Sequence, residues 1–75
     1  MYLRNDIDIT KFLSRVIKCQ EAVIFQSVTG DSFNLNSILS QVVFQNFVSE
    51  SDNWKKGTIH CLREEDYLLL KEYLR

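Results

Sequence analysis

Few residues in this 75-residue chain have the types and spacing that catalysis requires. The only histidine, His60, has no carboxylate at a local spacing that would orient its imidazole as a general base. Cys19 and Cys61 lie 42 residues apart with no CxxC pair, which matches neither a zinc motif nor a disulfide framework. We therefore expect both cysteines to be packing residues with free thiols, and we do not expect an enzyme.

The densest acidic cluster is the run from Glu64 to Asp66. Three consecutive positions of a helix point about 100° apart in turn, so these carboxylates cannot converge on one ion. Gly30 and Gly57 stand alone, outside any phosphate-binding or nucleophile motif. The sequence thus predicts no catalytic residue, no metal ligand and no cofactor.

The composition is that of one small globular domain spanning residues 1–75, with 45% hydrophobic residues, 25% charged residues and a net charge of −1. The near-zero charge disfavours the strong electrostatic attraction on which non-specific nucleic-acid binders depend. The N-terminus has no apolar segment typical of a signal peptide, and no membrane span is expected. We predict a cytoplasmic protein whose small core leaves some apolar side chains available to a partner.

Apolar periodicity indicates the elements that must position these residues. It predicts helices at 8–19, 36–48 and 63–75, a hairpin at 22–35 and a strand at 58–62. Asp8 is expected to cap the first helix and Asn36 the second. The predicted fold is α+β, in the order α-β-β-α-β-α. A three-stranded, mainly antiparallel sheet packs on three helices that cover one of its faces.

The hairpin register has two alternatives. A two-residue turn at Gly30 and Asp31 would pair Val28 with Phe33. A three-residue turn with a bulge would instead produce one apolar face, made by Val23, Phe25, Phe33 and Leu35. We favour the second alternative because its apolar face is coherent. The expected core comprises Phe12, Leu13, Val16, Ile17, Val23, Phe25, Phe33, Leu35, Leu39, Val42, Val43, Ile59, Cys61, Leu70 and Leu74.

From Ser32 to Ser49, 18 consecutive residues carry no charge. Uncharged polar side chains around an aromatic residue are typical of interface cores, where charge is depleted. We predict a protein-binding or self-associating surface formed by Ser37, Gln41, Phe44, Gln45, Val48 and Trp54. The alternative is that the helix at 36–48 is a central buried element that reaches solvent only through Ser and Gln.

Two further functions fit the sequence. Lys11, Arg15 and Lys18 form a basic stripe on the first helix, and Trp54 precedes Lys55 and Lys56. Cationic grooves with stacking aromatic residues bind single-stranded nucleic acid, so a nucleic-acid accessory or regulatory role is one alternative. A small inhibitor of another protein is the other.

The segment 30–41, GDSFNLNSILSQ, with Phe12, Leu13 and Cys19 before it, resembles a pattern in short uncharacterised bacterial proteins of anaerobic Gram-positive species. The resemblance covers roughly residues 12–43 and implies a small α+β cytoplasmic protein with no known activity. Some of those proteins carry an automatic label of poly(A) polymerase. A nucleotidyltransferase needs a Gly-Ser followed by paired aspartates, and no Gly-Ser precedes the nearest pair, Asp6 and Asp8.

Overall fold

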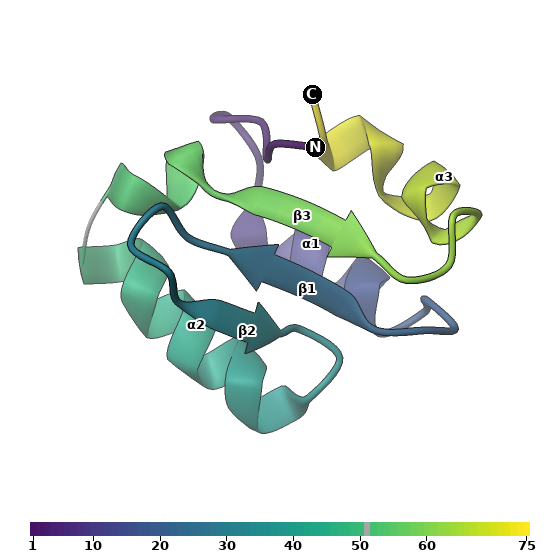
Figure 1. The fold of residues 1–75 in the computed structure, drawn as a ribbon, viewed down its shortest axis with the longest axis horizontal. Helices are drawn as coiled ribbons and strands as arrows, with labels where there is room; N and C mark the ends of the chain where they lie inside the picture. The colour runs from purple at the N-terminus through teal and green to yellow at the C-terminus, as the bar shows by residue number, and fades with distance from the viewer. Residues whose placement is uncertain (51) are drawn as a thin grey trace.

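The computed structural model describes residues 1–50 and 52–75, and its elements follow the predicted α-β-β-α-β-α order (Figure 1). Two short 3₁₀ helices, η1 and η2, are added to that order. The elements are α1 (Ile9–Val16), β1 (Val23–Gln26), β2 (Ser32–Asn34), α2 (Ile38–Glu50), η1 (Asp52–Lys56), β3 (Thr58–Cys61), α3 (Asp66–Leu70) and η2 (Lys71–Tyr73).

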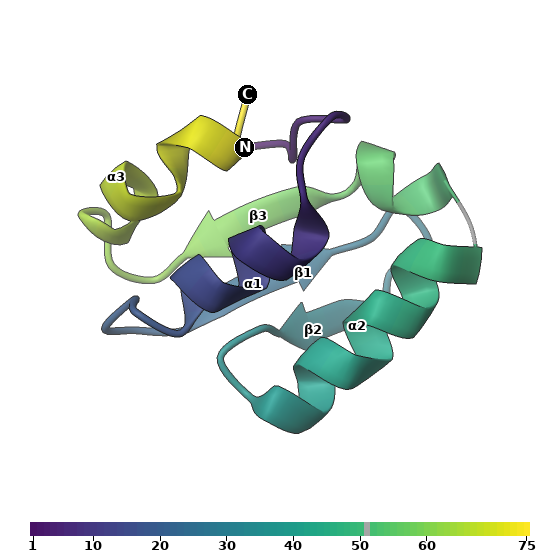
Figure 2. The same cartoon turned by 180° about the vertical axis from the view of Figure 1, so that it is seen from behind.

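The three strands form one antiparallel sheet in the order β2-β1-β3. Figure 2 shows α1, α2 and α3 on the same side of this sheet, as the sequence predicted. Side chains alternate across a strand, so every second residue faces away from the helices. Gln26, Asn34 and His60 are exposed residues of this kind on the open face.

The hairpin uses the longer of the two predicted turns. Phe25 pairs with Phe33, and the Ser27 N–H donates to the Asp31 carbonyl at 2.8 Å, which leaves three residues in the turn. Gly30 has a φ of +94°, the left-handed conformation that a three-residue turn with a bulge requires. The apolar face that favoured this register therefore points toward the helices.

Helix α1 begins as predicted and ends earlier. The Asp8 carboxylate accepts a hydrogen bond from the Lys11 N–H at 3.3 Å, which satisfies one of the unpaired amides of the first turn. The last turn tightens, because the Lys18 N–H bonds to the Arg15 carbonyl. Ile17 follows the end of α1 and is exposed, although it was expected in the core.

The predicted C-terminal helix at 63–75 is replaced by the short α3, then η2, then an extended end. Leu74 has φ −113° and ψ 157° and pairs with Leu3 in an isolated antiparallel bridge. Tyr2 and Arg75 exchange two backbone hydrogen bonds, of 3.2 and 2.8 Å. This pairing buries both Leu3 and Leu74, which explains why the C-terminal residues are extended instead of continuing as a helix. The two chain ends therefore lie side by side (Figure 1).

The core agrees with the prediction in α1 and in most of the sheet, and differs from it mainly in α2. Phe33 and Cys61 are half-buried rather than buried, and Leu39, Val42 and Val43 lie at the surface. The buried apolar side chains are Leu3, Phe12, Leu13, Val16, Cys19, Val23, Phe25, Leu35, Phe44, Trp54, Ile59, Leu70 and Leu74.

The Asn36 side chain links the residues before α2 to the residues at the start of β1, instead of capping α2. Its side-chain oxygen accepts from the Val23 N–H at 2.5 Å, and its amide donates to the Glu21 carbonyl at 3.2 Å. The hydroxyl of Ser37 accepts from the Ser40 N–H in the first turn of α2. The predicted cap is therefore displaced by one residue, because the Asn36 amide is occupied at the start of β1.

Candidate interaction surface

Helix α2 has two apolar sides of different character. One side carries Phe44, Phe47 and Val48, and the other carries aliphatic residues near the start of the helix. The larger aromatic side faces the sheet. The sequence prediction had this helix turned the other way, with the aliphatic residues in the core and Phe44 outside.

The inward side of α2 is held by rings and by one amide. The Phe44 ring lies 4.9 Å from the Phe25 ring and 5.9 Å from the Phe33 ring, measured between centroids. The Gln41 side-chain nitrogen donates to the Leu35 carbonyl at 2.7 Å and lies 3.4 Å from the Leu13 carbonyl. A buried amide with two backbone partners orients α2 as specifically as the rings do.

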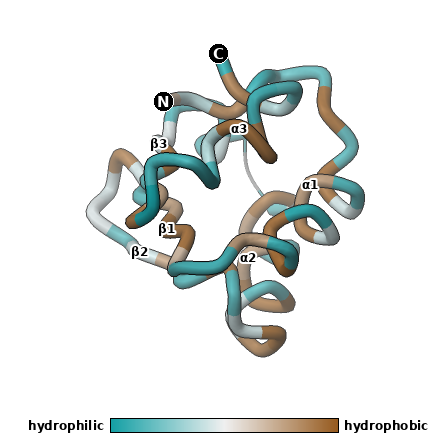
Figure 3. Tube along the Cα trace, turned by 90° about the vertical axis from the view of Figure 1, so that its right-hand side faces the viewer, coloured by the Kyte–Doolittle hydropathy of each residue, from teal (hydrophilic) through white to brown (hydrophobic). Residues whose placement is uncertain are grey.

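The outward side of α2 is an exposed apolar surface. Ile38, Leu39, Val42 and Val43 are 72%, 77%, 52% and 49% exposed. We call these four residues the aliphatic face of α2. Figure 3 shows α2 at one end of the molecule, remote from α3 and from both chain termini.

The structure separates the residues that were predicted to form the interaction surface. Phe44, Gln41 and Trp54 are buried, so they support the fold and are not available for direct contact. Val48 is half-buried, whereas Gln45 is exposed on α2 and Ser37 is exposed just before it.

The sequence did contain a signal for the missed residues. Both sides of α2 are apolar, so periodicity alone cannot decide which side enters the core. In the structure the rings of Phe44 and Phe47 pack against phenylalanine rings of β1 and β2. These aromatic side chains are larger than the valine and leucine side chains of the other side. Side-chain volume is therefore the difference between the two sides that the sequence contains, although it does not by itself decide which side is buried.

The residues of the predicted basic stripe line a shallow depression of about 280 Å³, with Lys11 and Arg15 on α1 and Lys18 beyond its end. Arg15 is fixed there, because its guanidinium pairs with Glu72 at 3.1 Å, donates to the Leu69 carbonyl at 3.2 Å and lies over the Tyr73 ring. These contacts join α1 to the C-terminal elements. The residues of the depression are Thr10, Lys11, Ser14, Arg15, Lys18 and Tyr73.

Trp54 does not offer a stacking surface to nucleic-acid bases. It is 7% exposed and belongs to the core. Lys55 lies over its ring and pairs with Asp52 at 3.7 Å. The predicted combination of a stacking aromatic residue with Lys55 and Lys56 is therefore absent from the surface that the structure describes.

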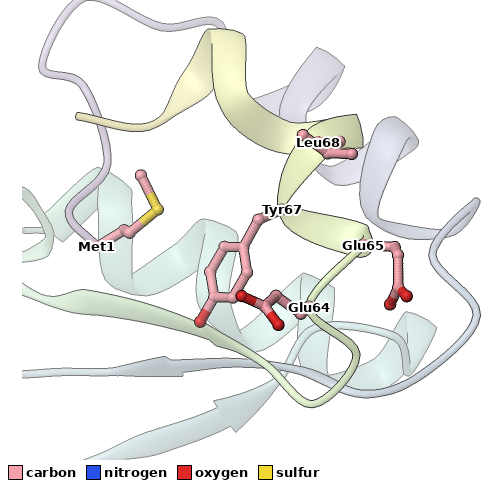
Figure 4. Close-up of a pocket in the computed structure, with 5 residues that line it drawn as sticks. All are labelled: Met1, Glu64, Glu65, Tyr67 and Leu68. Atoms are coloured by element: carbon pink, nitrogen blue, oxygen red, sulfur yellow. The ribbon is translucent and has the colours of Figure 1, made fainter.

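A second depression, of about 450 Å³, lies beside α3. Figure 4 shows the side chains that line it, which are those of Met1, Glu64, Glu65, Tyr67 and Leu68. The Tyr67 hydroxyl accepts a hydrogen bond from the Cys61 N–H at 3.0 Å, and Glu65 forms a salt bridge with Arg63 at 3.3 Å. This surface combines exposed apolar atoms with carboxylates at its margin.

Both cysteines are free and lie near a buried carboxylate. Asp66 accepts hydrogen bonds from the backbone N–H groups of Gln20 and Glu21, at 3.4 and 3.2 Å. Burial, and to a lesser degree the charge of Asp66, raises the pKa of Cys19. Burial, with the neighbouring Cys19 and Asp66, raises the pKa of Cys61 to about 11. Both groups are thiols rather than thiolates near neutral pH, which makes them weak nucleophiles.

His60 lies on the open face of the sheet. Its Nε2 is 3.1 Å from the Thr58 hydroxyl, and the pair is exposed. Within residues 1–50 and 52–75, no group of three or more His, Cys, Asp or Glu side chains is arranged to hold a metal ion. None of the helices in these residues combines the length and apolarity needed to cross a bilayer.

Comparison of the chain with models of protein families, with curated proteins and with solved structures found no match.

Proposed function

We propose that this protein is a non-catalytic protein–protein interaction module, and that it binds through the aliphatic face of α2. The observation that carries the proposal is the exposure of four aliphatic side chains on a helix whose other side is already packed. Fully burying one such side chain stabilises by roughly 1.5–3 kcal/mol. A partner that covers this face therefore gains a substantial hydrophobic contribution.

The residues around this face favour a protein partner. Gln45 and Asn46 are exposed on α2, and amide side chains both donate and accept hydrogen bonds. An apolar centre with uncharged polar neighbours has the composition of a protein interface, which is depleted in charge. This supports the predicted kind of function while moving the contact residues to the opposite side of the helix.

The thiols support the non-catalytic and cytoplasmic parts of the proposal. A cysteine nucleophile needs a lowered pKa, whereas burial raises the pKa of both Cys19 and Cys61. Free thiols persist in the reducing cytoplasm. The free thiols therefore support the proposal of a cytoplasmic module.

Site-specific photo-crosslinking in cells that naturally contain the protein tests this proposal. A photoreactive amino acid replaces Leu39 in one variant and Val28 in the matched control. Val28 is also an exposed aliphatic residue, but it lies in the hairpin turn. We expect a discrete crosslinked protein product from position 39 and none from position 28.

The product from position 39 is identified by mass spectrometry, with a second copy of the chain counted among the acceptable partners. Lack of a product at position 39, or the same products at both positions, would contradict an interaction through this face.

A further inference from the structure

The aliphatic face of α2 is suited to contact with itself. In a two-fold symmetric interface the same patch lies on both subunits, so a charge close to the axis meets its own sign. No residue from Ser32 to Ser49 is charged, and the one charged residue of α2, Glu50, is its last residue, whereas the aliphatic face lies near its start. An antiparallel pair centred on this face keeps the two Glu50 carboxylates apart, so it has no such repulsion. The amides of Gln45 and Asn46 are also self-complementary, because each both donates and accepts.

The other exposed apolar surface lacks this property. Leu68, beside α3, is 70% exposed, but the depression that it lines also contains Glu64 and Glu65. Pairing this surface with its own copy would bring carboxylates together. Of the two apolar surfaces, only the aliphatic face of α2 is both exposed and free of like charge.

We propose that the aliphatic face of α2 binds a second copy of this chain, with the two α2 helices antiparallel across a two-fold axis. This inference rests on the proposed function and names its partner. The antiparallel arrangement sets the helix dipoles in opposition, which is favourable. With the axis midway between Leu39 and Val42, Leu39 of each copy meets Val42 of the other. The four residues of this face are exposed, and α2 lies at one end of the molecule (Figures 2 and 3).

The size of this face sets the expected strength of the dimer. A helix of 13 residues is about 20 Å long. One helix pair of this length buries less than the roughly 800 Å² per partner that is usual for stable complexes. We therefore expect a weak, reversible dimer rather than a stable one.

Sedimentation equilibrium of the purified full chain, from about 5 to 500 µM, measures this association. The average mass should rise from that of one chain toward that of two over this range. The Leu39→Glu variant should bind itself at least about tenfold more weakly, because it places two carboxylates in the contact. Position 39 is in the first turn of α2, where a negative charge is favourable, so the variant retains its helix.

Leu68→Glu is the matched control, since it makes the same change at a similarly exposed leucine near the start of α3. It should leave the dissociation constant unchanged. Circular dichroism and thermal unfolding of both variants confirm that each is folded. A Val42→Glu variant provides a second disruption of the same face and should also weaken the dimer.

Two results would overturn self-association through α2. One is a chain that stays monomeric at 500 µM, and the other is a dimer weakened by Leu68→Glu but not by Leu39→Glu or Val42→Glu. A monomeric chain whose photo-crosslink at position 39 captures a different protein removes the dimer and leaves the proposed interaction function standing.

Discussion

Phe44 and Leu39 occupy opposite sides of the same helix and have opposite surroundings. The Phe44 side chain is fully buried among the rings of Phe25, Phe33 and Phe47, whereas Leu39 is the most exposed of the four aliphatic residues. A substitution at each position therefore measures which side of α2 belongs to the core.

Phe44→Ala should lower the free energy of unfolding by about 3–5 kcal/mol, because it removes a buried ring and leaves a cavity. Leu39→Ala should change it by no more than about 0.5 kcal/mol, as is usual for an exposed position. Urea denaturation followed by circular dichroism measures both, at a concentration well below that of dimer formation. In a core this small Phe44→Ala alone can unfold the chain, so Phe44→Leu provides a milder step in the same direction. A larger loss at Leu39 than at Phe44 would show that α2 is turned the other way.

The elements are positioned by close contacts that a helix or strand pattern does not reveal. Gly57 connects η1 to β3 and is buried against β1. A Cβ at this position would overlap the ring of Phe25 and approach the Gln26 carbonyl oxygen at 2.9 Å. Glycine at 57 therefore permits η1 and β3 to approach the central strand.

Gly57→Ala should lower the free energy of unfolding by about 1–3 kcal/mol through steric overlap, measured by thermal or urea denaturation. Gly30 provides a contrast, because it has open space around it and a φ of +94°. Gly30→Ala should be destabilising through backbone strain, and Gly30→Asn less so, since asparagine tolerates that conformation. Gly57→Asn should be no better than Gly57→Ala. A milder effect of asparagine at position 57 would contradict the steric explanation.

The whole molecule is closed by contact between its two chain ends. Residues 1–4 lie between β3 and the C-terminal residues, with the Ile59 N–H bonded to the Met1 carbonyl and the Arg4 N–H bonded to the Tyr73 carbonyl. Leu3 and Leu74 are both buried in the core. Segments separated by most of the sequence thus complete one hydrophobic interior.

Leu74→Ala should lower the free energy of unfolding by about 2–5 kcal/mol, because it opens a cavity beside Leu3. Amide hydrogen exchange should locate the effect. Protection of the Arg4 and Ile59 amides should fall more than protection of Leu35, whose N–H bonds to the Val23 carbonyl in the hairpin. Leu68→Ala, at an exposed position, is the control. It should change neither the free energy of unfolding nor the protection of these amides. Equal loss of protection at all three amides would indicate that the chain ends do not open as a separate unit.

Local patterns predicted the elements whose two faces differ in polarity. The stripe of α1, the cap at Asp8 and the hairpin turn at Gly30 follow from spacing and from backbone preference, and they appear in the structure. The α-β-β-α-β-α order and the placement of the helices on one face of the sheet follow from these elements, because each must bury its apolar side against another.

The sequence by itself also determined that charge is missing between Ser32 and Ser49, which is the property on which the proposed interaction depends. Only the tertiary structure decided which side of α2 is exposed, since both sides are apolar and the buried one is the side whose Phe44 ring packs against Phe25 of the sheet. It likewise decided that the chain ends pair, because hydrogen bonds between Tyr2 and Arg75 join residues that no local pattern relates. Hydrophobic periodicity describes one helix or strand at a time. The orientation of α2 and the pairing of the chain ends depend instead on how several elements pack against one another.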